Sequence, residues 1–346
     1  MSAQHVRRVL FRLDFSRRTG WGHLARCAAL AGELRSRGWE CVLCTDGDLA
    51  GAPPELRDVY HRVVSAGPGW ELHPPKDVRA GDWIVVDDYS VGDLQLRQLA
   101  KALSDGNLTR RPRVLVMDDE GHRRLDAADL VLNSRLGLER SPYAPEVAAL
   151  LGTRFALLRP GLARPESVTL PLPTGADGVL IMLGGTDPRG FTPVVIEALG
   201  DIDPARFCPV IVRARETPDA GVIRRALDRF AVSVWLERLD ASSLAGWARC
   251  CSFAVSAAGG ALYELALLRL PFVAIVVAEN QRALAAEVRT RWRLPVVDVE
   301  EDVRGAVATA FRALIASNET ARREALARIP IDTRGPARVA EMMEKM

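Results

Sequence analysis

Residues 6–38 read VRRVLFRLDFSRRTGWGHLARCAALAGELRSRG, and this stretch decides the fold. Its first part, Val6–Asp14, is typical of a β-strand. Its last part, Leu24–Arg37, repeats apolar residues at helical spacing and stops at Gly38. A strand that leads through a glycine-containing turn into a helix is the first half of a parallel βαβ unit.

The same alternation continues along the chain. Short apolar runs predict further strands at Glu40–Thr45, Trp83–Asp87, Arg113–Met117 and Asp129–Leu132. These runs are continuously apolar, as expected for a parallel sheet that helices cover on both faces. A second series of predicted strands follows at Gly178–Leu183, Pro209–Val212, Val232–Trp235, Phe253–Ser256, Phe272–Val277 and Pro295–Val297. From Glu301 onward the pattern is mostly helical, with interruptions at Ile329-Pro330 and Gly335-Pro336.

Between the two series the pattern lapses after Arg159, in a proline-rich stretch that favours a linker. We therefore predict an N-terminal domain over 1–160, a linker over 161–177, and a C-terminal domain with a helical tail over 178–346. The length of 346 residues suits two domains. The predicted fold class is α/β, with two doubly wound Rossmann-like domains, an interdomain cleft, and ligands at the carboxyl ends of the strands.

Composition excludes several classes of protein. A net charge of +2, with arginines scattered among acids, predicts no binding of nucleic acid. No apolar run is long enough to span a bilayer, and the start of the chain lacks the apolar core of a signal peptide. We expect a cytoplasmic protein with reduced cysteines. The number of subunits stays open, and a monomer is compatible with the sequence.

Cys41 and Cys44 are spaced like a redox or zinc pair. They lie inside a predicted strand, where alternate side chains point to opposite faces, and no second pair at metal-ligand spacing accompanies them. We interpret them as buried apolar residues and expect neither a metal nor a cofactor.

The first motif that carries chemistry is Arg12-Leu-Asp14 followed by Gly20-Trp-Gly22-His23. Glycines in such a turn allow positive φ and the close approach of a ligand. A histidine in the first turn of the next helix can exchange protons near neutral pH. We predict His23 as the catalytic residue, with Asp14 orienting its ring or holding water. The alternative is a capped turn with a surface histidine.

Two motifs of the second domain resemble phosphate-binding loops. Gly184-Gly185-Thr186-Asp187 follows a predicted strand, so its backbone amides and the Thr186 hydroxyl are expected to face a diphosphate. Ser256-Ala-Ala258-Gly259-Gly260 joins a strand to a helix start, which offers free N–H groups to an anion. Glu264, one turn further, is placed to accept the hydroxyls of a ribose. The alternatives are ordinary strand-to-helix turns.

Polar side chains end three further strands. Asn280 and Gln281 suit sugar hydroxyl and acetamido groups, although Asn280 is equally suited to cap a helix. The pairs Asp87-Asp88 and Asp118-Asp119 invite a metal, but no histidine at ligand spacing supports one. We interpret these acids as hydrogen-bonding groups for a sugar or as solvated strand ends.

Together these segments resemble the UDP-sugar hydrolase family of the pseudaminic acid pathway and its spore-coat polysaccharide relatives, which share the GT-B fold of the peptidoglycan lipid II glycosyltransferase. The matching pieces are Arg12-x-Asp14, Gly20-x-Gly22-His23-x-x-Arg26-Cys27, Asp87-x-Tyr89, Phe155–Pro160, Gly184–Pro188, Glu264 and Asn280-Gln281. Their order and spacing hold over nearly the whole chain.

The resemblance implies metal-independent hydrolysis of UDP-2,4-diacetamido-2,4,6-trideoxy-β-L-altropyranose to the free sugar and UDP. His23 matches the family's catalytic histidine, Tyr89 and Asn280 match residues lining the sugar site, and Glu264 matches the acid that binds uridine's ribose. The expected substrate-binding set is Arg12, Gly20, Gly22, Tyr89, Gly184, Gly185, Thr186, Ser256, Ala258, Gly259, Gly260, Glu264, Asn280 and Gln281.

The chain departs from the family pattern at three places. Gly259-Gly260-Ala261 stands where relatives usually have Gly-Ser-Thr, so two hydroxyls are absent from the phosphate loop. Gly161-Leu162 replaces an acid and an aromatic residue, and Asp88 replaces a histidine or asparagine.

Other functions stay open. In a GT-B glycosyltransferase, His23 would activate an acceptor hydroxyl instead of water. Residues 46–80 show no basic amphipathic helix, which favours the hydrolase. A non-catalytic nucleotide-sugar binder and a UDP-sugar 2-epimerase are further alternatives. Intact His23 and Asp14 argue against the first, and the acid–base groups of the second cannot be placed.

Overall fold

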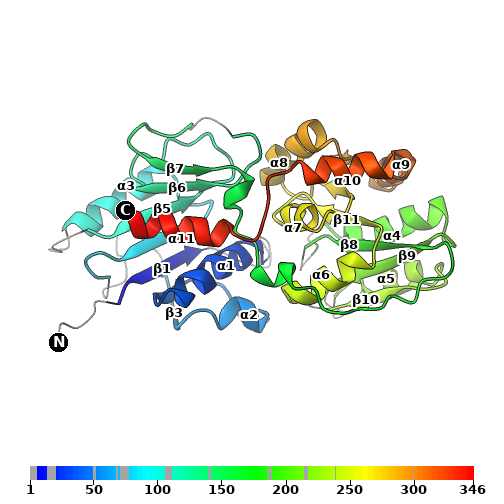
Figure 1. The fold of residues 1–346 in the computed structure, drawn as a ribbon, viewed down its shortest axis with the longest axis horizontal. Helices are drawn as coiled ribbons and strands as arrows, with labels where there is room; N and C mark the ends of the chain where they lie inside the picture. The colour runs from blue at the N-terminus through cyan, green and yellow to red at the C-terminus, as the bar shows by residue number, and fades with distance from the viewer. Residues whose placement is uncertain are drawn as a thin grey trace. The chain divides into compact units, whose positions relative to one another are not determined.

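The computed structural model describes residues 6–346 apart from 14–20, 50–51, 68, 71–77, 106–110, 139–141, 185–186, 188, 214–216, 238 and 299. The chain forms two compact units. Unit 1 comprises Met1–Arg159 and Thr333–Met346, and unit 2 comprises Pro160–Asp332. Each unit contains one parallel sheet (Figure 1).

The sheet of unit 1 has the order β3-β2-β1-β4-β5-β6-β7. Its strands are β1 (Arg8–Leu13), β2 (Glu40–Cys44), β3 (Arg62–Val64), β4 (Trp83–Asp87), β5 (Arg113–Met117), β6 (Leu130–Asn133) and β7 (Ala148–Leu151). The helices are α1 (Gly22–Ser36), α2 (Pro54–Arg57), α3 (Asp93–Asp105) and α11 (Gly335–Lys345), with the short 3-10 helix η1 (Thr153–Phe155).

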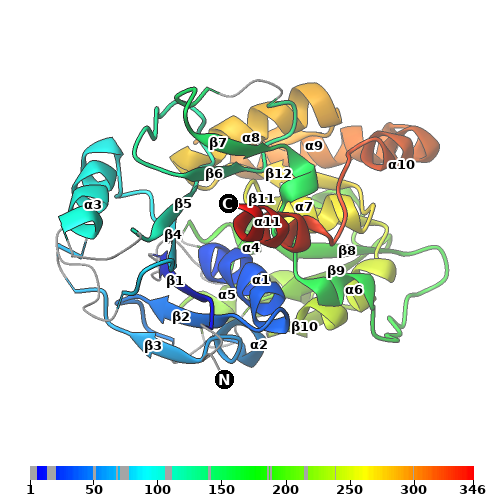
Figure 2. The same ribbon diagram turned by 60° about the vertical axis from the view of Figure 1, so that its left-hand side comes forward.

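Helices cover both faces of this sheet. Alternate strand residues belong to two apolar clusters, Val85 and Leu115 to one and Val86 and Val116 to the other. The first cluster includes residues of α1 and α11, and the second includes residues of α3. Figure 2 shows α3 on the opposite side of β4 and β5 from α1 and α11. This double cover explains the continuously apolar strands.

The sheet of unit 2 has the order β10-β9-β8-β11-β12-β13. Its strands are β8 (Asp177–Met182), β9 (Phe207–Val212), β10 (Val234–Leu236), β11 (Phe253–Ala257), β12 (Phe272–Ile275) and β13 (Val296–Val297). Its α-helices are α4 (Phe191–Ile202), α5 (Ala220–Leu227), α6 (Ala241–Arg249), α7 (Ala261–Leu267), α8 (Arg282–Glu287), α9 (Val303–Ala316) and α10 (Glu319–Ala327). The 3-10 helices η2 (Pro160–Ala163) and η3 (Glu279–Gln281) and the π-helix η4 (Val288–Trp292) complete the unit.

In both sheets, the order in which strands are added reverses beside the first strand. The chain builds outward from β1 through β2 to β3, then returns to pair β4 with the other edge of β1. In unit 2, β11 returns in the same way to pair with β8. The fold is therefore two doubly wound α/β units, as the sequence predicted, although β3 and β7 were not predicted. In such sheets the reversal point is where ligands bind, outside the carboxyl ends of the strands.

Two boundaries differ from the prediction. The predicted linker 161–177 packs on unit 2, where a Cβ at Gly246 of α6 would lie 2.6 Å from the carbonyl oxygen of Glu166. The C-terminal helix α11, predicted as part of the second domain, belongs to unit 1. Arg37, the C-cap residue of α1, donates to Glu344 of α11 at 2.8 Å, and Val339 and Met343 join the unit 1 core.

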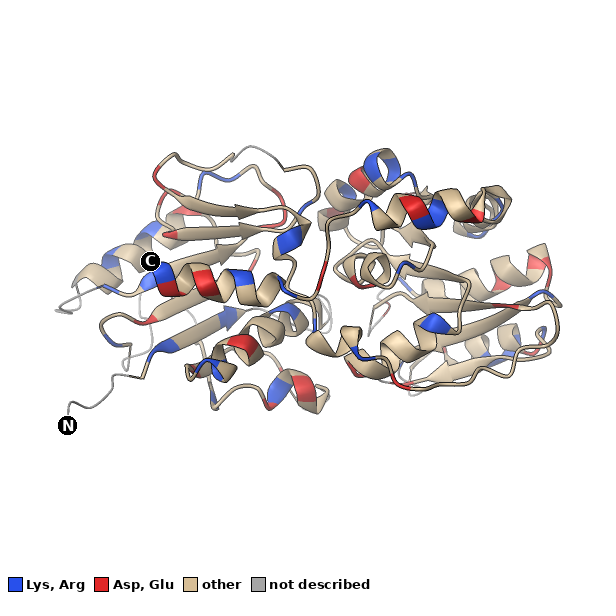
Figure 3. Ribbon diagram, in the orientation of Figure 1, with Lys and Arg blue, Asp and Glu red and all other residues tan. Residues whose placement is uncertain are grey.

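Charges of both signs are interspersed on the ribbon, and α11 carries red segments with blue ones on either side of them (Figure 3). Among the described residues, no helix combines the length and apolar character that a membrane span requires.

Gly335 at the start of α11 has no room for a side chain, because a Cβ there would lie 2.0 Å from the carbonyl oxygen of Ala156. We predict that Gly335→Ala lowers the free energy of unfolding of unit 1 by about 1–3 kcal/mol, the usual cost of overpacking. Denaturant unfolding measures it. The control is Gly221→Ala in α5, where a Cβ meets only Arg225 Nη1, at 3.7 Å, and which should be neutral or slightly stabilising. Equal effects of the two substitutions would contradict the close packing of α11.

Candidate functional site

A polar cluster lies at the reversal point of unit 1. β1 and β4 are neighbours, and their register pairs Leu13 with Asp87. α1 begins at Gly22, so His23 lies in its first turn. Parallel pairing thus brings Asp87, at the carboxyl end of β4, beside the histidine of a helix that follows β1.

His23 is held by Asp87 through one ring nitrogen. Its Nδ1 lies 2.9 Å from Asp87 Oδ1 and 3.2 Å from the Asp87 carbonyl oxygen. Both neighbours are acceptors, so Nδ1 carries the proton and the neutral ring presents Nε2 as the basic nitrogen. The residue is 8% exposed.

Arg26, one turn later on α1, joins two loops. Its Nε and Nη2 donate to Asp87 at 2.7 and 2.5 Å, and its Nη1 donates to both oxygens of Asp119 at 2.8 Å. Tyr89 donates its hydroxyl to Asp119 Oδ2 at 2.5 Å. The rings of Tyr89 and His23 meet edge to face, with centroids 4.8 Å apart.

The pKa values of this cluster follow from burial and from these pairs. Burial would lower the pKa of His23, but the Asp87 carboxylate outweighs it and raises that pKa above its usual value. Burial would raise the pKa of Asp87, but Arg26 and His23 hold it well below its usual range. Burial and the Asp119 carboxylate raise the pKa of Tyr89, so its phenol stays a hydrogen-bond donor.

The strand-end acids Asp87, Asp88 and Asp118 are buried rather than solvated, whereas Asp119 is half-buried. Asp87 and Asp118 are buried, and Asp118 pairs with Arg123 at 2.6 Å. Asp88 is 5% exposed and pairs with Arg12 Nη2 at 3.1 Å. Buried carboxylates that are paired with arginines are already charge-compensated.

Arg12 therefore lies next to the His23 cluster, with its guanidinium 5.2 Å from the centre of the Trp70 ring. Asp14 and Gly20 lie outside the described residues. Gly22 does not have the positive φ that was expected, since it begins α1, and it is exposed with open space where a Cβ would stand. The group that orients His23 is Asp87, which was predicted to be a hydrogen-bonding group for a sugar or a solvated strand end and not the partner of the histidine.

In unit 2, the loop after β8 is anchored by Asp187. Gly184 is exposed with φ of 87°, a conformation that favours glycine. Asp187 is buried and accepts from the backbone N–H groups of Phe191 and Thr192 at 3.0 and 2.7 Å, which caps α4. Arg213 donates to Asp187 at 3.1 Å. Gly185 and Thr186 lie outside the described residues.

The loop after β11 exposes only part of its predicted site. Ser256 and Ala258 are fully buried, and the Ser256 hydroxyl donates to the carbonyl of Ala257 at 3.2 Å. Gly259 donates its N–H to the same carbonyl at 2.8 Å, so this N–H is already hydrogen-bonded within the loop. Among residues 258–263, the N–H groups of Gly260 and Ala261 have no acceptor in the described part of the chain. They are the amides open to an anion.

Gln281 lies beside this loop. Its Oε1 accepts from the N–H of Val277 at 3.0 Å, and its Nε2 lies 3.7 Å from the position of a Cβ on Gly259. Asn280 is exposed within η3 and is not a helix cap, since the N-cap of α8 is Gln281. Glu264 is half-buried on α7.

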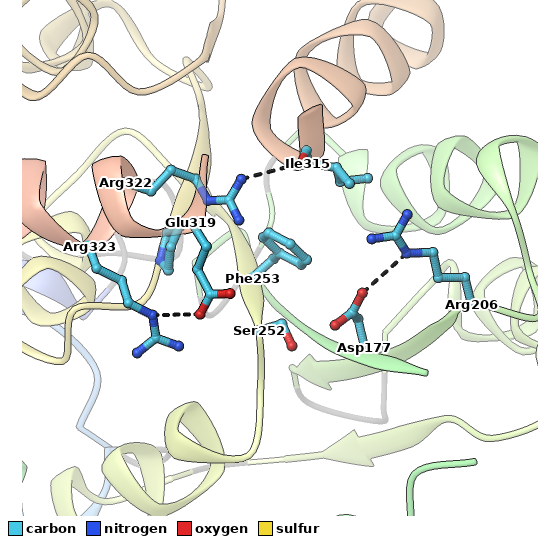
Figure 4. Close-up of a pocket in the computed structure, with 9 residues that line it drawn as sticks. Asp177, Arg206, Ser252, Phe253, Ile315, Glu319, Arg322 and Arg323 are labelled. Carbon is cyan, nitrogen blue, oxygen red and sulfur yellow. Dashed lines mark hydrogen bonds and ion pairs between the residues drawn. The ribbon is translucent and has the colours of Figure 1, made fainter. Parts of the chain in front are cut away.

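Two hollows lie at the opposite, amino ends of the strands. One, in unit 2, has a volume of about 170 Å³ and is lined by the first residues of β8 and β11, Asp177 and Phe253 (Figure 4). Two of its arginines already bind groups of the protein, since Arg206 pairs with Asp177 and Arg322 donates to carbonyls at the end of α9. The other, of about 600 Å³, is lined in unit 1 by Arg8, Trp83 and Arg113, the first residues of β1, β4 and β5. We place the candidate site at the carboxyl ends, where doubly wound sheets bind ligands.

Comparisons with known proteins agree on the architecture. No protein-family model and no curated protein sequence matches the chain. Among solved structures, the chain is similar to MurG of Acinetobacter baumannii, with 14% identity, 98% of this chain and 100% of that chain covered, and a TM-score of 0.63. It is similar to Staphylococcus aureus MnaA in a structure with UDP, with 13% identity, coverage of 98% and 96%, and a TM-score of 0.63. A glycosyltransferase of kitacinnamycin has 16% identity, coverage of 99% of both chains and a TM-score of 0.66.

The chain has the GT-B fold. The similarity spans nearly the whole length of both chains in each of these comparisons, so both units contribute to it. At these identities it establishes the fold and leaves the activity to the residues of the site.

Asp87→Asn should lower the pKa of His23, because it removes the carboxylate that raises that pKa while an amide oxygen can still accept from Nδ1. Titration of the histidine rings by NMR measures this change. The control is His122, an exposed residue paired with Glu120 at 3.2 Å, whose ring signals should be the same in the variant and the wild type. An unchanged His23 titration in the folded variant would show that Asp87 does not set its pKa.

Proposed function

We propose that this protein hydrolyses a UDP-diacetamido-trideoxyhexose to the free sugar and UDP, with His23 as general base. The observation that carries the proposal is the pair of His23 and Asp87, which leaves Nε2 as the basic nitrogen in a cluster at the reversal point of unit 1. The resemblance of the Gly22-His23 and Asp87-x-Tyr89 segments to the pseudaminic-pathway hydrolases supports the substrate class. The product would then enter nonulosonic acid biosynthesis.

In the proposed step, a water oxygen forms a bond to the anomeric carbon while the bond from that carbon to the UDP oxygen breaks. His23 Nε2 takes the proton of the water, and the resulting imidazolium is stabilised by Asp87. The electron pair of the breaking bond leaves with UDP, which is a good leaving group and needs no strong general acid. The proton on His23 then passes to solvent and restores the base.

We assign the nucleotide to unit 2. The free amides of Gly260 and Ala261 supply donors for the diphosphate, and Glu264 on α7 supplies a carboxylate for the ribose hydroxyls. Gly184 and the partly described loop after β8, with Gly185 and Thr186, are the second proposed phosphate contact. In unit 1, Tyr89 is 37% exposed beside His23 and offers an aromatic surface to the sugar, and Arg12 is the adjacent cation.

The second candidate is an inverting glycosyltransferase in which His23 deprotonates an acceptor hydroxyl. The similar structures favour it, because they include a kitacinnamycin glycosyltransferase and the spinosyn rhamnosyltransferase SpnG, the latter also solved with thymidine diphosphate. The two candidates use the same base and differ only in the nucleophile.

His23→Ala should lower turnover by about 10²- to 10⁴-fold, the usual contribution of a general base. UDP affinity should stay nearly unchanged, because the proposed UDP contacts lie in unit 2. The measurements are steady-state release of UDP and calorimetric binding of UDP. The matched control is His122→Ala, which removes an exposed imidazole outside the cluster. Turnover like that of the wild type in His23→Ala would eliminate His23 as the base.

A panel of UDP-diacetamido sugars, followed by NMR, separates the candidate functions. We expect release of UDP and free sugar in water alone. Turnover that requires an added acceptor alcohol would identify a transferase instead. Binding without turnover of any sugar, with or without acceptor, would identify a nucleotide-sugar binder.

A further inference from the structure

Arg26 is the residue through which the elements of the His23 cluster are joined. It lies on α1, Asp87 ends β4, and Asp119 follows β5. Each of its three guanidinium nitrogens donates to one of these two carboxylates. These hydrogen bonds hold the guanidinium between the two carboxylates, although the side chain is 23% exposed.

Arg26 fixes the plane of the Asp87 carboxylate. Two parallel hydrogen bonds from Nε and Nη2 hold both carboxylate oxygens, a geometry that only a planar fork provides. With Oδ1 and Oδ2 held, Oδ1 stays 2.9 Å from His23 Nδ1, and Oδ2 accepts from the Cys27 thiol at 3.5 Å. The carboxylate therefore acts together with the Asp87 carbonyl oxygen, 3.2 Å from Nδ1, in keeping the proton on that nitrogen.

Arg26 also restrains a second neighbour of the His23 ring, Tyr89, through Asp119. It holds both oxygens of Asp119, and Asp119 holds the hydroxyl of Tyr89. The Tyr89 ring packs against His23 with an interplanar angle of 84°. One arginine thus restrains both the partner of Nδ1 and the aromatic wall of the ring.

The charges around His23 act on its pKa in opposite directions: the carboxylates raise it and Arg26 lowers it. The groups that face it are Asp87, Asp119, Arg26 and the neutral Tyr89, and the Cys27 thiol and Tyr60 phenol stay protonated because burial raises their pKa values. With a neutral imidazole the cluster carries two negative charges and one positive charge, so protonation of His23 balances it. Without Arg26, both carboxylates would act on His23 unopposed.

We propose that Arg26 is a positioning residue for His23, which locks Asp87 onto Nδ1 and Tyr89 against the ring so that Nε2 stays the free base. The contacts above support this positioning role. Its consequence for turnover rests on the proposed hydrolase function.

The test compares Arg26→Met and Arg26→Lys with the wild type by ¹⁵N NMR of the histidine rings, with His23 assigned from a His23→Gln sample. In Arg26→Met the pKa of His23 should rise, because a neighbouring positive charge is lost. At high pH, the neutral His23 ring should be a mixture of the Nδ1-protonated and Nε2-protonated tautomers, instead of the Nδ1-protonated tautomer alone. Arg26→Lys keeps the charge but not the fork, so it should change the tautomer with a smaller shift in pKa.

Arg97→Met is the matched control. Arg97 also holds a carboxylate through Nε and Nη2, that of Asp126, but at the surface of α3 and away from His23. It should leave the His23 titration and tautomer unchanged. A folded Arg26→Met with the wild-type titration and tautomer would overturn the proposal. If that variant does not fold, an unchanged tautomer in Arg26→Lys would overturn it in the same way.

Turnover gives the second readout. Arg26→Met should lower kcat about 10- to 100-fold with little change in KM, the order of loss that a misplaced catalytic group causes. The acid limb of its pH profile should move to higher pH, since the base form exists only above the pKa of His23. If the wild-type protein hydrolyses none of the UDP-sugars, the proposed function is refuted. The NMR result would still decide the role of Arg26.

Discussion

The contact between Asp87 and its three partners is the constraint on which the site of unit 1 depends. A carboxylate that is 1% exposed is costly unless its charge is compensated, and here Arg26 and His23 compensate it. The compensation runs in both directions, because the same carboxylate raises the pKa of His23 and prepares it to accept a proton. Local stability and basicity therefore come from one group.

Topology explains why this contact forms where it does. The return of the chain from β3 to β4 pairs β4 with β1 and places Asp87, at the end of β4, beside His23 in the first turn of α1. The same reversal in unit 2 brings the loop after β8 next to the loop after β11, with the open amides of Gly260 and Ala261. Both sets of candidate residues are thus products of strand order, and neither is contiguous in sequence.

This dependence on strand order determines how much the sequence could predict. Strands with a buried apolar centre, such as Trp83–Asp87 and Arg113–Met117, were predicted with the bounds that the structure has. β3 was missed because it is three residues long with Val63 46% exposed, and α11 was misassigned because its docking on α1 is a tertiary contact. His23 and its turn were visible as a motif. Asp14, near in sequence, was predicted to orient His23, whereas the register of β1 and β4 puts Asp87 there.

The proposed phosphate loop of unit 2 illustrates that a departure in sequence need not remove a function of the backbone. The chain has Gly260-Ala261 where the hydrolases that it resembles have hydroxyl residues, so those side-chain donors are absent. The donors at a helix start are backbone N–H groups, which do not depend on the side chain. Gly260 has an ordinary helical φ of −55°, with open space where a Cβ would stand. Neither the backbone nor packing therefore requires glycine at position 260, and the proposed phosphate contact through the N–H groups of Gly260 and Ala261 does not depend on it.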